Sequence, residues 1–197
     1  MKKLKTALCA LCIALMAAPA FADTTKEEIE LLKQKVQEQP QSADAQFDLA
    51  MGLARTSKLE VAWSALRKVN ELDASYADKV IERYTPLVQE NPQNIEARFR
   101  LAFGYYFKNQ KDVARSQFGE IIKVDPNYVW AYNYLGFFDA EKGEVAKEME
   151  LWKKAIQIDP KNAVAHFLIG QAHYRNGQMK EAAAEIAQAM KLRGSEN

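Results

Sequence analysis

The stretch IIKVDPNYVWAY at residues 121–132 decides the fold, because the chain repeats its pattern as AIQIDPKNAVAH at residues 155–166. The prolines of these two stretches, Pro126 and Pro160, lie 34 residues apart. Self-similarity at a period of this length is typical of proteins that are built from stacked structural units. The sequence therefore predicts a repeat protein with a unit of 34 residues.

Each unit has the pattern of helices rather than strands. Phe118, Ile121 and Ile122 recur at the spacing of one helix face. The helix is expected to end at Asp125, because the residue before a proline is pushed out of the α region. No segment of the chain shows the sustained alternation of apolar and polar residues that is typical of a strand. We therefore expect an all-α protein.

Small and apolar residues fall at matching places when the units are superposed. The matching sets are Leu101, Leu135 and Ile169; Gly136 and Gly170; Ala97, Ala131 and Ala165; and Ala114 and Phe118 with Ala182 and Ile186. The period and these positions resemble the tetratricopeptide repeat (TPR), in which each unit is a pair of antiparallel helices. The resemblance implies a right-handed α-solenoid with an N-terminal half-repeat and one inserted helical segment.

The repeat also predicts how the chain is divided. The expected organisation is a signal peptide at 1–22, an N-terminal helix or half-repeat at 23–42, repeat 1 at 43–76, an inserted helical segment at 77–94, repeat 2 at 95–128, repeat 3 at 129–162, and repeat 4 with the C-terminus at 163–197. Thr24 with Glu27, or Thr25 with Glu28, is expected to form a capping box. Pro86 is expected to kink the inserted segment or to restart it as a new helix.

The first 22 residues have the layout of a secretory signal peptide. Lys2, Lys3 and Lys5 form a basic start, and an apolar run follows from about residue 7 to residue 18. The sequence Ala20-Phe21-Ala22 then offers a cleavage site. We therefore predict cleavage after Ala22 and a periplasmic or secreted protein, with a signal like those of Gram-negative bacteria. An uncleaved N-terminal anchor is the alternative.

Cleavage at this site changes the composition of the mature chain. Both cysteines leave with the signal, so no disulfide or thiol site is expected. Three of the 27 basic residues also leave, and 24 minus 26 acidic residues gives a charge of −2. A chain of this charge is not expected to bind nucleic acid, because phosphate binding needs a basic surface. No membrane span is expected after cleavage.

The TPR resemblance also implies a binding face. In TPR solenoids the first helix of each pair lines the concave surface, and here those helices are rich in aromatic residues. The residues placed there are Phe47, Met51, Arg55, Phe99, Phe103, Tyr106, Phe107, Trp130, Asn133, Phe137, Phe167, Gln171, Tyr174 and Arg175. An apolar concave surface of this kind is typical of a site for a protein or peptide segment. We therefore predict an exported scaffold or adaptor of cell-envelope assembly.

Several alternatives to an open groove remain at this point. The N-terminal helix or the 77–94 segment could fold into the groove, or a second copy could fill it in a self-associating structural solenoid. A periplasmic protein that binds a small molecule or a metal is another alternative. Its site would use Asp139, Glu148 and His173, which depart from the TPR pattern. The simpler interpretation is a polar pair with a glutamate that reaches water.

The chain has none of the motifs that would predict an enzyme. It lacks Gly-x-Ser-x-Gly, His-Glu-x-x-His and the glycine-rich loops that bind phosphates. One TPR subtype clamps C-terminal carboxylates with a lysine at a place where this chain has Phe47, Phe99, Asn133 and Phe167. Recognition of an acidic tail is therefore not expected. We predict a protein without catalytic residues, a cofactor or a bound metal.

Overall fold

The computed structural model describes residues 24–141 and 145–195, and all its secondary structure there is α-helical. The helices in chain order are α2 (Lys26–Glu38), α3 (Ala43–Leu53), α4 (Leu59–Leu72), α5 (Tyr76–Glu90), α6 (Ile95–Phe107), α7 (Lys111–Val124), α8 (Val129–Glu141), α9 (Val145–Ile158), α10 (Ala163–Arg175) and α11 (Met179–Ser195). The predicted signal peptide at 1–22 lies outside the described residues. Within those ranges, no helix is both long and apolar enough to cross a membrane.

Side chains of polar residues cap several of the helices at their N-termini. Thr25 and Glu28 form the capping box at the start of α2, which is the second of the two pairs that we predicted. Ser42, Asn94 and Asn162 cap α3, α6 and α10, and each accepts a hydrogen bond from the backbone N–H three residues later. These bonds satisfy backbone donors that a helix leaves free in its first turn, so they define where the helices begin.

Consecutive helices pack against each other in pairs: α3 with α4, α6 with α7, α8 with α9, and α10 with α11. Glycine permits the close approach in one of these pairs. A Cβ atom on Gly136 of α8 would lie 2.3 Å from Nε1 of Trp152 on α9. The Trp152 Nε1–H instead donates a hydrogen bond of 3.2 Å to the carbonyl oxygen of Asn133. The predicted all-α fold of TPR-type helix pairs is confirmed.

The inserted segment forms a single helix. α5 runs from Tyr76 to Glu90 with Pro86 inside it, so the expectation that Pro86 restarts the segment as a new helix is wrong. Proline inside a helix lacks the N–H donor and its ring crowds the carbonyl four residues earlier, and packing along the rest of α5 compensates for this cost. α5 packs against α6, with Val80 lying so close to Gly104 that a Cβ there would be 2.8 Å from Val80 Cγ1.

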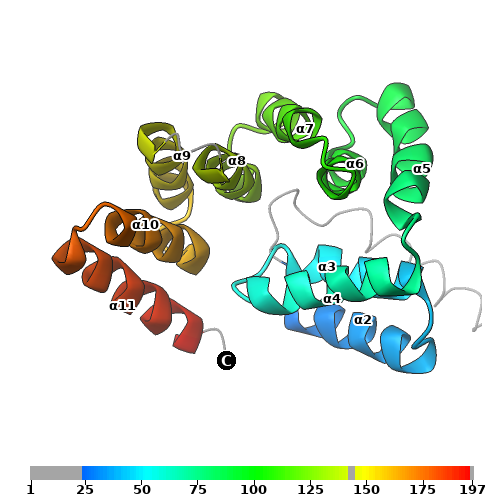
Figure 1. Cartoon of the computed structure of the whole chain (residues 1–197), viewed down its shortest axis with the longest axis horizontal. Coiled ribbons are helices and arrows are strands. Elements are labelled where there is room, and N and C mark those ends of the chain that lie inside the picture. Colours follow the sequence, from blue (N-terminus) through cyan, green and yellow to red (C-terminus); the bar gives the residue numbers. More distant parts are fainter. Residues whose placement is uncertain (1–23, 142–144, 196–197) are drawn as a thin grey trace, which may run out of the picture.

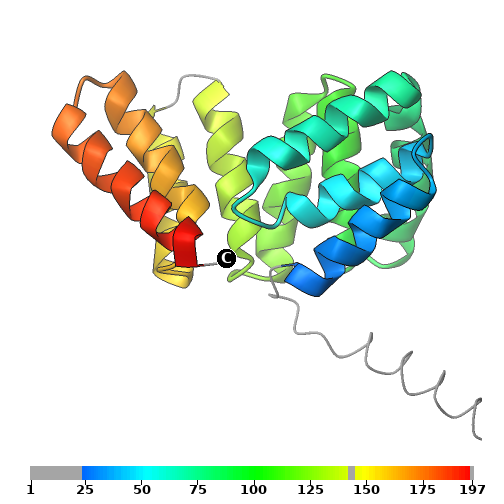
Figure 2. The same cartoon turned by 90° about the horizontal axis from the view of Figure 1, so that it is seen from below.

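The helices are arranged as an arch with a smaller group beneath it (Figure 1). α5 to α11 form the arch, and α2 to α4, which we call the N-terminal module, lie under it on the side of α5 and α6. The view from below shows the same arrangement, with the N-terminal module in front of the green helices of the arch (Figure 2). The first repeat therefore occupies space on the inner side of its own solenoid.

Candidate functional site

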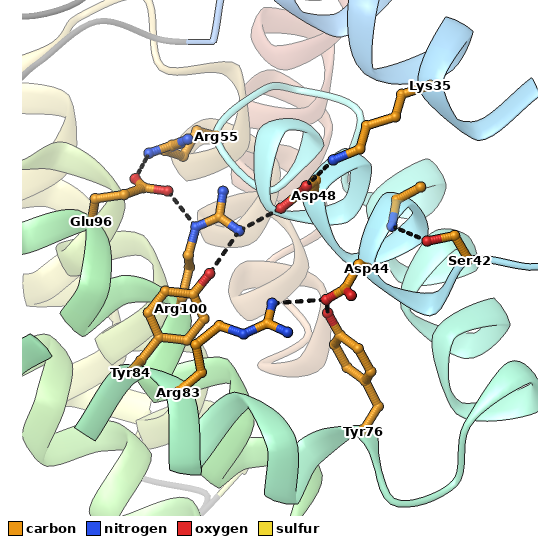
Figure 3. A network of polar contacts seen from close by, with 11 residues as sticks. Lys35, Ser42, Asp44, Asp48, Arg55, Tyr76, Arg83, Tyr84, Glu96 and Arg100 are labelled. Atoms are coloured by element: carbon orange, nitrogen blue, oxygen red, sulfur yellow. Dashed lines mark hydrogen bonds and ion pairs between the residues drawn. The ribbon is translucent and has the colours of Figure 1, made fainter. Parts of the chain in front are cut away.

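Ion pairs join the N-terminal module to the arch (Figure 3). Asp48 on α3 accepts a hydrogen bond of 2.8 Å from Nη1 of Arg100 on α6, and its other oxygen lies 2.7 Å from Nζ of Lys35 on α2. Arg100 is largely buried, with its side chain 17% exposed. Arg100 also binds Glu96, so it is held between two carboxylates. A buried arginine held in this way fixes the position of α3 relative to α6.

Glu96 on α6 completes this network. Its carboxylate pairs with Nε of Arg100 at 2.7 Å and with the guanidinium of Arg55, which follows α3. Burial alone would raise the pKa of Glu96, but the charges of Arg55 and Arg100 outweigh it and hold this pKa below the ordinary value of 4.5. The guanidinium of Arg55 also lies over the ring of Phe99, 5.4 Å from its centroid. Arg55 was expected to line an open groove, and it instead belongs to this contact.

Asp44 forms a second ionic contact between the module and the arch. Arg83 on α5 lies 2.7 Å from Oδ1 of Asp44, and the hydroxyl of Tyr76 donates to the same oxygen. The hydrogen bond from Arg83 is the main reason that the pKa of Asp44 is low, and the hydrogen bond from Tyr76 adds to it. The first repeat is therefore tied to α5 as well as to α6 (Figure 3).

Aromatic packing closes the same interface on its apolar side. Trp63 on α4 contacts four rings of α6 and α8, with centroid distances of 5.6 Å to Tyr106, 6.0 Å to Phe137, 6.4 Å to Phe107 and 6.5 Å to Phe103. Aromatic pairs at such distances stabilise a contact beyond the area that they bury. The residue at the centre of this ring cluster thus comes from the second helix of repeat 1.

These contacts correct the predicted open groove. Six of the residues that were expected to line it are at most 5% exposed: Phe47, Met51, Phe99, Phe103, Trp130 and Asn133. The physical reason is that the N-terminal module and the arch cover each other. Phe47 of α3 packs on Tyr76 of α5 with ring centroids 5.4 Å apart, and Trp63 of α4 lies 6.5 Å from Phe103 of α6. That part of the groove is therefore filled by the chain itself. α5 packs against α6 and also places Tyr76 against Phe47, whereas Trp63 of α4 occupies the ring cluster at Tyr106.

The other expected groove residues keep some contact with solvent. Tyr106 and Phe137 are half-buried, Phe107 and Phe167 are each 38% exposed, and Gln171, Tyr174 and Arg175 are exposed. Burial raises the pKa of Tyr106 to about 12, and the nearby charge of Glu141 adds to this effect. The structure therefore separates the predicted set into a covered part at α6 and a more open part at α10.

A cavity of about 210 Å³ remains between α4, α8, α10 and α11. We call it the α4–α10 cavity. It brings together five of the predicted groove residues, namely Trp130, Asn133, Phe137, Phe167 and Gln171. Its opposite wall contains Leu59 and Trp63 of α4, which the sequence interpretation missed. Their spacing of four residues does mark a second apolar stripe on α4, beside the core stripe of Ala62, Leu66 and Val69.

The two charged residues in the lining of this cavity form an ion pair with each other. Glu60 of α4 and Arg193 of α11 both line the cavity and form an ion pair of 3.6 Å across it. Their side chains are 68% and 49% exposed, so the pair lies at the solvent side. The remaining lining is mostly aromatic or aliphatic, with Phe167 and Leu168 contributed by α10. The cavity is thus apolar inside and neutral in net charge at its rim.

One buried amide in this lining is only half satisfied. Nδ2 of Asn133 donates a hydrogen bond of 3.2 Å to Oδ1 of Asn162, an oxygen that also accepts from the backbone N–H of Ala165 at 2.7 Å. Oδ1 of Asn133 has no hydrogen-bond partner among the described residues, although the residue is only 2% exposed. Buried polar atoms without a partner are uncommon in folded proteins and call for an explanation.

Asp139, Glu148 and His173 do not form a joint site. Asp139 is held by Arg115, whose Nε and Nη2 lie 2.8 and 3.2 Å from its two oxygens. Glu148 pairs with Arg175, and Nδ1 of His173 lies 2.7 Å from the side chain of Gln178. Glu148 is buried, so the interpretation that it reaches water is wrong. In the part of the chain that the structure describes, no three His, Cys, Asp or Glu side chains gather as a metal site.

Comparison with known proteins agrees with this architecture. Residues 139–177 match a family model described as a TPR repeat. The helix pairs of the structure have the arrangement that this repeat implies. The prediction that the chain is not an enzyme agrees with this match to a TPR repeat.

Three curated relatives are TPR proteins or share the repeat region. The chain is 25% identical over 126 residues to a TPR repeat-containing protein of Methanocaldococcus jannaschii, which covers 64% of this chain and 22% of the relative. It is 26% identical over 144 residues to the chloroplastic TPR domain-containing protein PYG7 of Arabidopsis thaliana, covering 71% and 43%. Heat shock protein STI1 of Saccharomyces cerevisiae is 28% identical over 111 residues, covering 55% and 18%. The chain thus spans less than half of each relative's length.

Among solved structures, the chain is similar in fold to MamA. One crystal structure of MamA has 21% sequence identity and a TM-score of 0.48, covering 85% of this chain and 88% of that one. A structure of MamA from Desulfovibrio magneticus RS-1 has 20% identity and a TM-score of 0.48, covering 98% and 95%.

Proposed function

We propose that this protein is an exported TPR scaffold or adaptor that binds a segment of a protein partner in the α4–α10 cavity. The observation that carries the proposal is an apolar cavity of about 210 Å³ on the inner side of the arch, with Phe167 38% exposed in its wall. Solenoid proteins use their concave surfaces for binding, and exposed apolar area of this kind usually marks an interaction site.

The mechanism is recognition by a preformed cavity. One wall belongs to repeat 1 through Leu59 and Trp63, and the other belongs to α8 and α10 through Phe137 and Phe167. The ion pairs and the ring cluster hold these walls in place before a partner arrives, which lowers the ordering cost of binding. Full burial of one large apolar side chain in such a site contributes about 1.5–3 kcal/mol, so a side chain of this kind would anchor the bound segment.

Export is the second part of the proposal. The basic start, the apolar run and Ala20-Phe21-Ala22 support a cleaved signal peptide, and therefore a place in the periplasm or outside the cell. A role in cell-envelope assembly is the part of the proposal that depends on this location. Mass spectrometry of the protein isolated from cell fractions would test it. We expect an N-terminus at Asp23 in the envelope or secreted fraction, and a cytoplasmic protein that keeps Met1 would contradict export.

The binding part can be tested by position-specific cross-linking. A photo-reactive amino acid is placed at position 167 in one variant and at position 113 in another. Val113 on α7 is 39% exposed, so the two positions match in exposure, and it does not line the cavity. We expect a cross-linked partner from position 167 only, and its loss when Gln171→Glu is added at the cavity wall. Equal products from both positions would contradict the proposal, and a product of twice the chain mass would favour self-association.

A further inference from the structure

We propose that the partner segment bound in the α4–α10 cavity carries an acidic side chain beside its apolar anchor, and that Lys26, Lys58 and Lys161 receive this carboxylate. The inference rests on the proposed function and names the chemistry of the partner at that same site. It starts from a second cavity of about 210 Å³, which these three lysines line and which we call the lysine pocket.

The lysine pocket forms where three separate segments of the chain meet. Lys26 is the first residue of α2, Lys58 directly precedes α4, and Lys161 lies between α9 and α10. The fold thus brings together cations that are far apart in the sequence. Like charges that line one cavity repel each other, and an anion between them offsets this repulsion.

The lysine pocket is continuous with the α4–α10 cavity. Four residues line both cavities: Ser57, Trp130, Ala163 and Val164. An extended peptide advances about 3.3–3.6 Å per residue. When one apolar side chain of a segment occupies the α4–α10 cavity, the residues next to this anchor are therefore well placed to enter the lysine pocket.

The charges in the lining of the lysine pocket are not balanced. Three lysines and two carboxylates, Glu30 and Asp159, leave a net charge of +1. Glu30 already forms an ion pair of 2.7 Å with Lys33, which lies outside the lining. Among the described residues, the ammonium groups of the three lining lysines form no ion pair. They remain available to a carboxylate from a partner.

The charges of two of these lysines act together on Glu30. The hydrogen bond from Lys33 is the main reason that the pKa of Glu30 is low, and the charges of Lys26 and Lys58 lower this pKa further. The two lysines therefore favour a negative charge at the same side of the pocket. A second carboxylate, brought by a partner, would be favoured in its charged form for the same reason.

Two neutral polar side chains of the lining are engaged within the protein. The hydroxyl of Thr56 donates to the carbonyl oxygen of Leu53 at 2.7 Å and accepts from the backbone N–H of Lys58 at 3.1 Å. Oδ1 of Asn162 accepts from the backbone N–H of Ala165 at 2.7 Å. The lysine ammonium groups are the strongest donors that the lining offers, because hydrogen bonds with an ionised partner are about twice as strong as neutral ones.

These lysines select among partner segments rather than supply most of the affinity. All three are exposed, and ion pairs with exposed lysines contribute little individually. An acidic residue beside the anchor gains their attraction, a neutral residue does not, and a basic residue is repelled. The apolar anchor supplies the affinity, and the lysine pocket determines which anchored segments bind.

Blocked synthetic peptides test this preference on the purified protein. One probe is acetyl-Glu-Ala-Phe-Ala-Glu-amide, and the other has glutamine in place of both glutamates. Acidic residues on both sides of the phenylalanine make the test independent of chain direction, and the blocked ends leave only side-chain carboxylates. Dissociation constants are measured by ligand-observed NMR titration. We expect the glutamate peptide to bind about fivefold more tightly at low salt, and the two affinities to converge at about 1 M salt, where the Debye length is about 3 Å.

Variants locate the preference in the lysine pocket. Lys58→Gln combined with Lys161→Gln is expected to reduce the difference between the two peptides to less than about twofold. Lys154→Gln combined with Lys180→Gln is the control, because it removes the same number of charges at exposed positions outside both cavities. The control should keep the full difference. An equal loss in both double variants would overturn the inference, since the attraction would then be general.

The outcomes separate this inference from the proposed function. Equal affinity for the two peptides, with both lost in Phe167→Glu, would overturn the inference and leave the apolar anchor in place. If neither peptide binds, the segment that is cross-linked from position 167 decides, and mass spectrometry gives its sequence. An acidic residue beside the cross-linked position, with a yield that falls in the Lys58 and Lys161 double variant, supports the inference. A segment without one overturns it, and the absence of any specific product at position 167 overturns the proposed function as well.

Discussion

The hydroxyl of Tyr134 on α8 donates a hydrogen bond of 2.7 Å to the backbone carbonyl oxygen of Ala54, a residue that lies 80 positions earlier in the chain. Both partners are buried, with Tyr134 7% and Ala54 1% exposed. Burial raises the pKa of Tyr134 above its ordinary value of 10, so the hydroxyl keeps its proton and remains a donor. This bond joins the end of α3 directly to the middle of the arch.

Replacement of this donor is expected to weaken the whole structure. Tyr134→Phe leaves the ring contacts in place but leaves the carbonyl oxygen of Ala54 buried without this hydrogen bond. We expect a loss of about 1–2 kcal/mol in the free energy of unfolding, measured by urea denaturation. Tyr174→Phe is the control, because Tyr174 is 62% exposed. Equal stabilities of the two variants would show that the bond contributes nothing.

Trp63 is expected to hold the N-terminal module against the arch. Trp63→Ala removes contacts with Phe103, Tyr106 and Phe137 and opens a gap in the ring cluster. Because Trp63 is half-buried, we expect a loss of about 2–3 kcal/mol, less than for a fully buried tryptophan. The native protein and the variant are compared by thermal unfolding and by binding of an apolar dye. Val61→Ala on the same helix, 48% exposed, should leave both readouts unchanged.

Acid is expected to loosen the contact between Glu96 and its two arginines. The folded-state pKa of Glu96 lies below the ordinary value of 4.5. At neutral pH the carboxylate is charged in both states, and its stabilising effect is fully present. As the pH falls below 4.5, the unfolded state binds the proton first, so stability is lost until the folded-state pKa is passed.

The variant Glu96→Gln tests whether the charge of Glu96 causes this loss of stability in acid. It should be less stable than the native protein at pH 7, and it should lose less stability between pH 5 and pH 3. Denaturant curves at several pH values measure both effects. Glu82→Gln, an exposed change on α5, is the control. An acid response of Glu96→Gln that parallels the native curve would show that this glutamate is not part of the acid-sensitive contact.

The contribution of Glu148 to stability is expected to change with pH in the opposite direction to that of Glu96. Its side chain is 0% exposed, and burial is the main cause that raises its pKa above 4.5. The charge of Arg175 partly offsets this rise, whereas Asp139 adds to it. Its contribution to stability is therefore present below pH 4.5 and is lost as the pH rises through the folded-state pKa.

A neutral side chain of the same shape should therefore be tolerated at position 148. We expect Glu148→Gln to be within about 1 kcal/mol of the native protein at pH 7, or more stable, because buried ion pairs are often replaceable. Thermal unfolding at pH 7 of this variant beside Glu96→Gln would show the contrast. A loss of stability as large as that of Glu96→Gln would mean that the charge of Glu148 is required.

The helix pairs were predictable because their signals are local. The period set by Pro126 and Pro160, the apolar spacing within each unit and the cap at Thr25 all act over a few residues. The position of Pro86 inside one continuous helix was not predictable in the same way. A proline inside a helix is tolerated when packing on the rest of the helix outweighs the lost hydrogen bond, and that packing depends on α6.

The candidate site was predictable only in part. The first-helix pattern predicted that Phe137, Phe167 and Gln171 share one face, and these three residues line the α4–α10 cavity. It could not show that Trp63 fills the groove, because the partners of this ring lie 40 to 74 positions later in the chain. Likewise, the ion pair of Glu148 joins it to Arg175, a partner that lies 27 positions away and outside its unit.

The hydrogen bond between Tyr134 and Ala54 also affects how the protein is expected to unfold. In a linear array each unit touches only its neighbours, so the ends fray first and stability is nearly a sum over adjacent units. Here the first unit is bound to units two and three through Arg100 and Tyr134, and to α11 through the ion pair of Glu60 with Arg193. Fraying at the N-terminus would break contacts in the middle of the chain, so we expect this solenoid to unfold as one cooperative body rather than as a one-dimensional stack.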